Sequence, residues 1–192
     1  MKNVLRSTLF AVCSLTAAAP LLAGPAIPAE GTVEVAFAPW DDAERLVMDQ
    51  IDGAEKAIYV QVHSLTSRGI AKTLIAARQR GLTVEIIADR ATVMTDERSA
   101  LPLVSGKGAS LWLDDAKTVV RSNMMIIDPD GKTPVVVTGS YDFSRQGMSG
   151  DADNALVLSG QRALARACMD NWLRHRAQSV SFADAVSGAA NR

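Results

Sequence analysis

The chain has 192 residues, of which 48% are hydrophobic and 21% charged, and its formal net charge is −1 at pH 7. This length and composition fit one globular domain with a substantial core and fall short of two domains. The near-neutral charge gives no global basic field for nucleic acid, although a phosphate group can still be bound locally.

Residues 1–29 are predicted to be a signal peptide followed by a short extended leader. Lys2 and Arg6 make the start positive, and an apolar run from Leu9 to Leu22 follows. That run is short for a membrane span of about 20 apolar residues and is broken by Pro20, so cleavage is favoured over an anchor. The mature protein is therefore expected to be exported, to the periplasm or outside the cell, without a transmembrane span.

Strand and helix patterns alternate from residue 30 onward. Asp41 and Glu44 form a capping-box pattern before a first helix, and Ser67 can cap a second helix that ends at Gly81. Residues 92–105 form a helical pattern that threonine, proline and glycine residues interrupt. Runs typical of strands lie at Val33–Phe37, Ala57–Leu65, Thr83–Ala88, Ser110–Leu113, Val119–Ile127, Val135–Ser140 and Ala155–Ser159.

The last long element is predicted to be a helix with Leu164, Cys168 and Trp172 spaced four residues apart on its apolar side. Because parallel strands need helical crossovers, the order of elements predicts an α/β fold with a mixed sheet sandwiched by helices. Residues 30–178 are expected to form this domain, and residues 179–192, which have little periodicity, a flexible tail.

The most specific pattern in the chain lies between Val119 and Asn154. Its matching residues are Asp128, Gly139, Ser140, Asp142, Phe143, Asp153 and Asn154. In this order they resemble the signature of the phospholipase D and bacterial nuclease superfamily, and most closely its compact branch with one motif per chain. That signature begins His-x-Lys-x4-Asp, whereas this chain has Arg121 at the histidine position and Asn123 at the lysine position.

The resemblance implies a phospholipase D/nuclease-like fold and metal-independent hydrolysis of phosphodiesters, with no cofactor. In the family the motif histidine forms a covalent phosphoenzyme, and two copies of a one-motif chain pair so that both motifs form one site. A homodimer is therefore implied. The substrate can be a phospholipid or a nucleic acid, and the composition does not decide between them.

The replaced motif residues change the chemistry that this site can perform. A guanidinium stays protonated and offers only donors, so Arg121 cannot attack phosphorus or accept a proton, but it can bind phosphate. Asn123 keeps a donor and loses the charge. Together with Ser140 and Asn154, these residues predict a phosphodiester-binding site in which catalysis is weakened or lost.

The remaining motif residues are assigned supporting roles by the resemblance. Asp128 belongs to the catalytic motif but is mainly a structural hydrogen-bond partner there, and Asp142 and Asp153 are structural at the site. Gly139 is expected to let the backbone come near a ligand. In a strand from Val119 to Ile127, side chains at 121, 123 and 125 share one face, which is either a solvated edge or the active-site cleft at the dimer axis.

Three further observations leave alternatives open. His63, at the end of a predicted strand, is either a relocated nucleophile of an active phosphodiesterase or a packed, hydrogen-bonded histidine. His175 has a packing or helix-end role. A non-catalytic envelope interaction protein is a third alternative, without a specific sequence feature. No metal site is predicted, because two histidines and Cys168, the one cysteine beyond the leader, lie far apart without a recognisable spacing.

Overall fold

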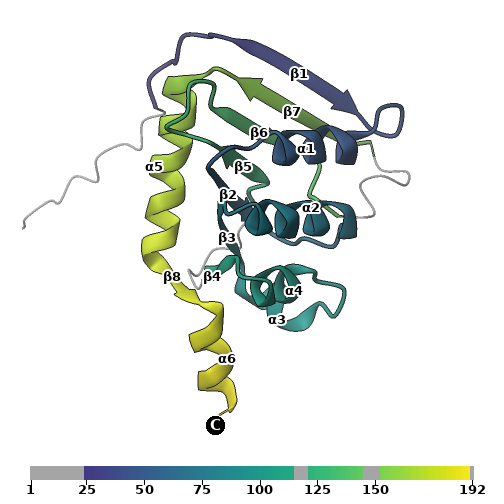
Figure 1. The fold of residues 1–192 in the computed structure, drawn as a ribbon, viewed down its shortest axis with the longest axis vertical. Helices are drawn as coiled ribbons and strands as arrows, with labels where there is room; N and C mark the ends of the chain where they lie inside the picture. The colour runs from purple at the N-terminus through teal and green to yellow at the C-terminus, as the bar shows by residue number, and fades with distance from the viewer. Residues whose placement is uncertain (1–23, 115–120, 145–151, 191–192) are drawn as a thin grey trace, which may run out of the picture.

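The computed structural model describes residues 24–114, 121–144 and 152–190, which form one eight-stranded mixed sheet with helices on both faces (Figure 1). The strands are β1 (Thr32–Phe37), β2 (Ala57–Val62), β3 (Thr83–Asp89), β4 (Ser110–Asp114), β5 (Met124–Ile127), β6 (Val135–Gly139), β7 (Asn154–Ser159) and β8 (Ser179–Ser181). The helices are α1 (Ala43–Asp52), α2 (Arg68–Gln79), α3 (Arg90–Thr95), α4 (Leu101–Gly106), α5 (Arg162–Gln178) and α6 (Phe182–Ala190). The α/β fold class predicted from the sequence is confirmed.

The order of strands across the sheet is β1-β7-β6-β5-β2-β3-β4-β8. β2, β3 and β4 are parallel, whereas β5 runs antiparallel to β2 and β6 antiparallel to β5. One edge of the sheet therefore gathers the carboxyl ends of β2 and β6 and the beginnings of β5 and β7. We call this edge, at Val62, Met124, Gly139 and Asn154, the carboxyl edge.

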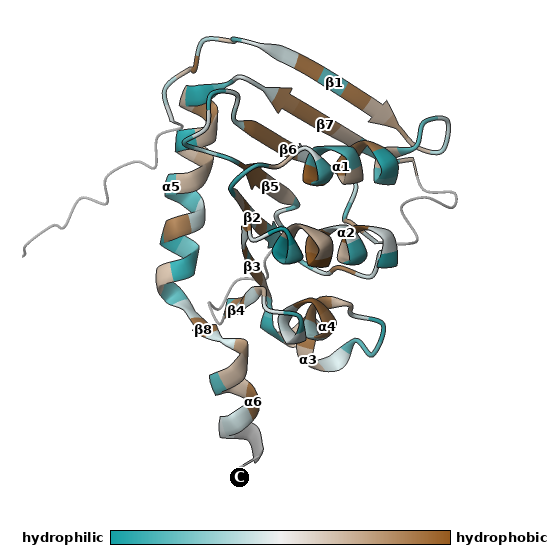
Figure 2. Cartoon of the chain, in the orientation of Figure 1, coloured by the Kyte–Doolittle hydropathy of each residue, from teal (hydrophilic) through white to brown (hydrophobic). Residues whose placement is uncertain are grey.

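The core has two layers, one on each face of the sheet. Ile58 and Val60 of β2 belong to the larger layer, which packs under α1 and α2. Tyr59 faces the other way and meets the ring of Trp172 from α5 edge-to-face at 5.1 Å. The Trp172 Nε1 donates a hydrogen bond to the Val60 carbonyl at 2.9 Å. Figure 2 shows the apolar central strands between helices of mixed polarity, as expected for strands buried on both faces, whereas β1 at the edge of the sheet is mostly exposed.

The first two helices begin side by side through one shared hydrogen bond. Ser67 caps α2 as predicted, since its hydroxyl oxygen accepts the Ile70 N–H at 3.0 Å. The predicted capping box of Asp41 and Glu44 is wrong: Asp42 caps α1, and Glu44 instead accepts the Ser67 hydroxyl. Because the Glu44 carboxylate binds Ser67, at the start of the neighbouring helix, it does not accept a hydrogen bond from the backbone at the start of its own helix.

Two other segments differ from the sequence expectation. The predicted helical pattern at residues 92–105 is divided between two short helices, α3 and α4, with the non-helical residues 96–100 between them, because Asp89 caps α3 and the chain turns at Asp96. The predicted flexible tail contains β8, which pairs with β4 at Leu113 and Val180, and then α6. Without β8, the backbone groups at this edge of β4 would be unpaired. The pairing with β4 therefore orders β8, although the sequence of residues 179–192 shows little periodicity. In the described part of the chain, no helix is long and apolar enough to span a membrane.

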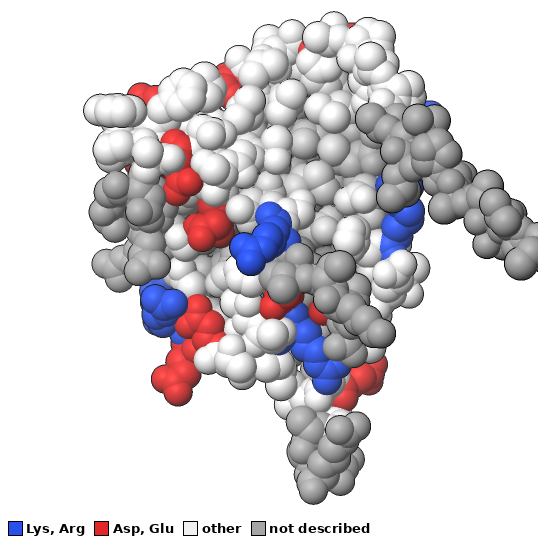
Figure 3. Space-filling view, turned by 180° about the vertical axis from the view of Figure 1, so that it is seen from behind, with Lys and Arg blue, Asp and Glu red and all other residues white. Residues whose placement is uncertain are grey.

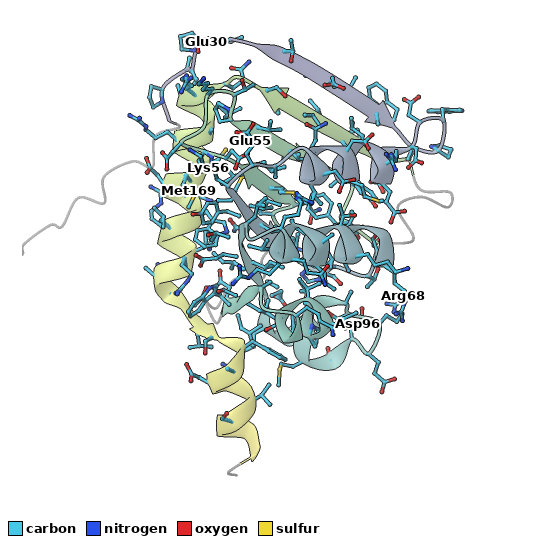
Figure 4. The ribbon with its side chains drawn as sticks, in the orientation of Figure 1. Glu30, Glu55, Lys56, Arg68, Asp96 and Met169 are labelled. Atoms are coloured by element: carbon cyan, nitrogen blue, oxygen red, sulfur yellow. The ribbon has the colours of Figure 1, made fainter. Side chains whose placement is uncertain are left out.

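Asp128 closes the sheet at the edge opposite the carboxyl edge. Its carboxylate accepts the backbone N–H groups of Glu55, Lys56 and Ala57 at 2.7, 2.7 and 2.8 Å. Figure 4 shows Glu55 and Lys56 far from Arg68, the residue that begins α2 at the carboxyl edge. The structural role expected for Asp128 fits this position, because three charge-assisted hydrogen bonds tie the start of β2 to the end of β5.

We expect Asp128→Ala to lower the free energy of unfolding by about 2 kcal/mol, because three N–H groups lose a charged acceptor. Urea unfolding followed by circular dichroism measures the change. Asp130→Ala is the matched control, since Asp130 is an exposed carboxylate in the adjacent turn. An equal loss of stability in both variants would contradict a stabilising role for the three hydrogen bonds to the Asp128 carboxylate.

Candidate functional site

The motif residues from three separate chain segments meet at the carboxyl edge. Arg121 and Asn123 lie in the segment that enters β5, Ser140 follows the end of β6, and Asn154 begins β7. β5 and β6 pair at Met124 and Thr138, and Asn154 follows on the next strand. Asp128 is the exception, because it lies at the other end of β5.

Ser140 and Asn154 form one hydrogen-bonded unit. The Ser140 Oγ accepts the backbone N–H of Asn154 at 2.9 Å and its side-chain Nδ2 at 3.3 Å. The backbone N–H of Tyr141 returns a hydrogen bond to the Asn154 carbonyl at 3.0 Å. Both acceptor positions of the exposed Ser140 hydroxyl are then used, so its hydrogen is directed to another acceptor such as a phosphoryl oxygen.

Gly139 is needed for the approach of β6 to β7. Its φ is +151°, and a Cβ at this position would lie 2.2 Å from the Asn154 carbonyl oxygen. The sequence predicted that this glycine lets the backbone approach a ligand. In the structure the close approach is to Asn154, so Gly139 acts by placing the Ser140–Asn154 unit.

The predicted strand Val119–Ile127 is longer than β5. The prediction that the side chains at positions 121 and 123 share one face of a strand is therefore wrong. Residues 119 and 120 lie outside the described part, and residues 121–123 precede the first strand residue, Met124. The Asn123 carbonyl accepts the Thr138 hydroxyl at 3.2 Å, whereas the Arg121 side chain is exposed. Strand alternation does not set the direction of these side chains, because the ladder begins only after them.

Four buried side-chain atoms have no hydrogen-bond partner among the described residues, and all belong to residues near the carboxyl edge. They are Gln61 Oε1, Ser64 Oγ, Asn123 Oδ1 and Tyr141 OH. Leaving such an atom unsatisfied costs about 1–3 kcal/mol, and folded proteins generally supply a partner, water or ligand. Their concentration at one edge marks it as a site prepared for polar contacts.

Sequence reasoning missed three of these four residues. The signal for Gln61 was present, since it is a single polar residue in the apolar run Ala57–Val62. Ser64 and Tyr141 gave no such signal. Tyr141 is almost fully buried, and its pKa is raised first by burial and then by the negative charges of nearby carboxylates, of which Glu44 contributes most. Its hydroxyl stays protonated and can donate a hydrogen bond.

Asp142 and Asp153, which were predicted to be structural at the site, each make one hydrogen bond to a backbone N–H at the carboxyl edge. The Asp142 carboxylate accepts the Ser144 N–H at 3.1 Å, which closes a turn beside the left-handed Phe143 (φ +54°). The Asp153 carbonyl accepts the Ala38 N–H at 2.8 Å. Both residues hold loops at the carboxyl edge through backbone hydrogen bonds.

His63 also lies at the carboxyl edge, directly after β2. Its Nε2 is 3.3 Å from the Thr92 hydroxyl oxygen, and this hydroxyl donates to the buried Asp89 carboxylate at 2.9 Å. Since the Thr92 hydrogen is directed to Asp89, Nε2 is the donor to Thr92. The hydrogen-bonded histidine predicted as one alternative is present, and it is oriented through Thr92 by a carboxylate.

His175 has a partner that its position in the sequence did not suggest. His175 lies in the last turn of α5, at the helix end as predicted, and its Nδ1 also lies 2.8 Å from Oδ2 of Asp114, whose side chain is 1% exposed. Asp114 ends β4, so this pair also lies at the carboxyl edge of the sheet. No sequence pattern pointed to it, because 61 residues separate the two partners.

A family model described as "Cardiolipin synthase, PLD-like domain" matches residues 47–174 of this chain. The chain belongs to the phospholipase D-like family. Two relatives named "Phospholipase D" are similar along most of this length. The Rickettsia felis protein is 28% identical over 147 residues, covering 77% of this chain and 70% of the relative. The Rickettsia typhi protein is 27% identical over 151 residues, covering 78% and 71%.

Solved structures agree with this assignment. Nuc from Salmonella typhimurium, described as a phospholipase D family member, superposes with a TM-score of 0.72 at 27% identity and covers 79% of this chain and 97% of its own. NucT from Helicobacter pylori has a TM-score of 0.68 at 18% identity, covering 79% and 99%, and supports the fold alone. The family resemblance predicted from the motif is confirmed.

The surface of this phospholipase D-like chain carries both signs of charge. Figure 3 shows arginine and lysine residues interspersed with acidic residues on the face seen from behind, with wide uncharged areas between them. Within the described ranges, no cluster of three or more histidine, cysteine or acidic residues could hold a metal ion.

We expect Gly139→Ala to displace Ser140 and Asn154 and to destabilise the fold by about 2 kcal/mol, because the added methyl group meets a backbone carbonyl. Urea unfolding and the backbone amide chemical shifts of both residues measure the effect. Gly106→Ala is the control, since a Cβ there meets nothing within 4 Å. A Gly139→Ala protein as stable as this control would contradict the proposed packing.

Proposed function

We propose that this chain is an exported phosphodiester-binding protein of the phospholipase D-like family in which hydrolysis is weakened or lost. One observation carries the proposal: Arg121 and Asn123 occupy the motif positions of the catalytic histidine and lysine, at an edge where buried polar atoms lack partners among the described residues. Binding groups are retained there and the nucleophile is replaced.

The binding chemistry follows from the donors at the carboxyl edge. Arg121 supplies a permanent positive charge and planar N–H groups that match phosphate oxygens. The Ser140 hydroxyl hydrogen is available because Asn154 occupies its acceptor positions. A phosphodiester anion bound by these donors meets no group in the Arg121 side chain that can attack phosphorus, and no metal or cofactor is part of the proposal.

A small phosphodiester, such as a lipid headgroup, fits this site better than a long nucleic acid. Non-specific binding to nucleic acid depends on several lysine or arginine contacts with successive phosphates. The face in Figure 3 interleaves basic and acidic residues. Relatives named "Phospholipase D" support the same substrate class.

The second candidate is an active phosphodiesterase that uses His63. The observation in its favour is the chain of hydrogen bonds from His63 through Thr92 to Asp89, because a carboxylate that orients a histidine is typical of histidine catalysis. In this alternative a ring nitrogen attacks phosphorus, the bond from phosphorus to the leaving alcohol breaks, and water later hydrolyses the phosphohistidine. The non-catalytic envelope interaction protein has no structural observation of its own.

Pairing into a homodimer is part of the proposal, and β1 offers the surface for it. Val33, Val35 and Phe37 lie on one face of β1 with 57%, 46% and 51% of their surfaces exposed. α5 packs on β4, β5 and β6 of the sheet, which leaves this row outside its cover. Because Phe37 pairs with Asn154, a second copy on this row would lie beside the site.

The first experiment assays the purified mature protein on a chromogenic phosphodiester with chelator present. We expect no turnover by the native chain and turnover by the double variant Arg121→His with Asn123→Lys, since the nucleophile and the phosphate charge return together. Turnover by the native chain that His63→Ala abolishes would establish the second candidate. An inactive double variant that also fails to bind the phosphodiester would contradict the proposed function.

We expect Val35→Lys to convert a dimer into a monomer, because a charge placed in an apolar interface must be desolvated. Size-exclusion chromatography with light scattering measures the mass. Leu103→Lys is the matched control, since Leu103 is 49% exposed on α4, away from β1. A native chain that is monomeric at high concentration would rule out this dimer.

A further inference from the structure

Gln61 is the least explained polar residue in the sheet. It belongs to β2, is 2% exposed, and its Oε1 has no partner in the part of the chain that the structure describes. It pairs with Met124, the residue after Asn123. Gln61 therefore lies next to the motif segment, one strand away, at the carboxyl edge.

Packing does not account for an amide at this position. Gln61 lies on the same face of β2 as Tyr59, which packs against Trp172, and its register partner Met124 is buried. An apolar side chain of similar length would suit these neighbours without leaving a buried oxygen unsatisfied. The amide is better explained by a contact that the described residues do not provide.

Asn123 presents the same feature from the neighbouring segment, because its Oδ1 is also buried without a partner among the residues described. Both orphan atoms are carbonyl oxygens, which only accept hydrogen bonds. The oxygens of a phosphodiester anion are acceptors too, so phosphate itself cannot satisfy them. Any ligand that does so must carry an N–H or O–H group.

We infer that Gln61 and Asn123 form an acceptor pair that selects phosphodiesters whose alcohol carries a hydrogen-bond donor, such as an ethanolamine ammonium. This inference rests on the proposed function, since Arg121 and Ser140 are taken to hold the phosphate. In this arrangement, donors bind the phosphoryl oxygens, and the two amide oxygens accept hydrogen bonds from the alcohol portion of the ligand.

The charge around the site is consistent with a cationic alcohol. Burial chiefly raises the pKa of Tyr141, which belongs to the larger layer of the core, and the negative charges of Glu44, Asp142, Asp42 and Asp153 raise it further, so carboxylates lie near the residue that follows Ser140. A primary ammonium group gains from these charges and donates N–H groups to the amide oxygens. A quaternary ammonium has the same charge and no N–H.

The test compares two soluble ligands of equal charge, glycerophosphoethanolamine, whose ammonium group carries N–H donors, and glycerophosphocholine, whose ammonium group carries three methyl groups instead, by calorimetry on the mature protein. We expect the ethanolamine compound to bind about tenfold more tightly, because a buried acceptor without a donor penalises the choline compound. Gln61→Leu should remove this preference, so that the two compounds bind with the same affinity. Gln61→Glu, which retains an acceptor, should keep the preference.

Two further measurements separate the outcomes. Arg121→Ala should weaken both ligands alike, since it removes a phosphate contact. Failure of the native protein to bind either ligand would overturn the proposed function, whereas equal binding of both would overturn only the acceptor pair. Persistence of the preference in Gln61→Leu would overturn it as well. If Gln61→Leu does not fold by circular dichroism, Asn123→Ala takes its place with the same expected loss of preference.

A last comparison identifies the source of the ligand. Phosphatidylcholine vesicles with and without phosphatidylethanolamine are mixed with the protein and sedimented. Preferential sedimentation with the ethanolamine-containing vesicles supports the inference with a lipid headgroup as the source. Binding of soluble glycerophosphoethanolamine alone supports it with a free phosphodiester as the source.

Discussion

The antiparallel pairing of β5 with β2 is the interaction on which the rest of the structure depends. It sets the end of β2, with Gln61 and His63, beside the segment that carries Arg121 and Asn123. At the other end of the same pair, the Asp128 carboxylate holds the start of β2 through backbone N–H groups. A change of one residue in this register would turn the alternate side chains of β5 to the other core layer. The hydrogen bonds of Asp128 and the position of the site residues therefore depend on the same strand register.

The site combines an intact scaffold with altered chemistry. Gly139 still allows β6 to approach β7, and the Ser140–Asn154 unit is formed. A phosphodiester needs donors, and these are present, whereas attack on phosphorus needs a lone pair that a guanidinium lacks. Loss of one nucleophile leaves the surrounding hydrogen bonds unchanged, because they are made by other residues. The proposed loss of catalysis is therefore compatible with the proposed retention of phosphodiester binding.

Local sequence signals predicted the structure well wherever the deciding contacts were local. Ser67 caps α2 because its own hydroxyl reaches three residues along the chain. Predictions were wrong where the deciding contact was made by a residue far away in the sequence. Glu44, predicted to cap α1, accepts a hydrogen bond from Ser67 instead, and part of the predicted tail forms β8, which pairs with the edge of β4. The strand expected from residue 119 begins only at Met124, since apolar alternation does not show where a partner strand ends.

By itself, the sequence determined the α/β class, the family and the chemical limits of Arg121 and Asn123, because residue identity and local periodicity are written in neighbouring positions. Only the tertiary structure decided which polar groups have partners. The Asp114–His175 pair spans 61 residues, and that the Gln61 Oε1 has no partner among the described residues is evident only from the packed structure. Hydrogen-bond satisfaction depends on distances and angles between chain segments that local sequence does not encode.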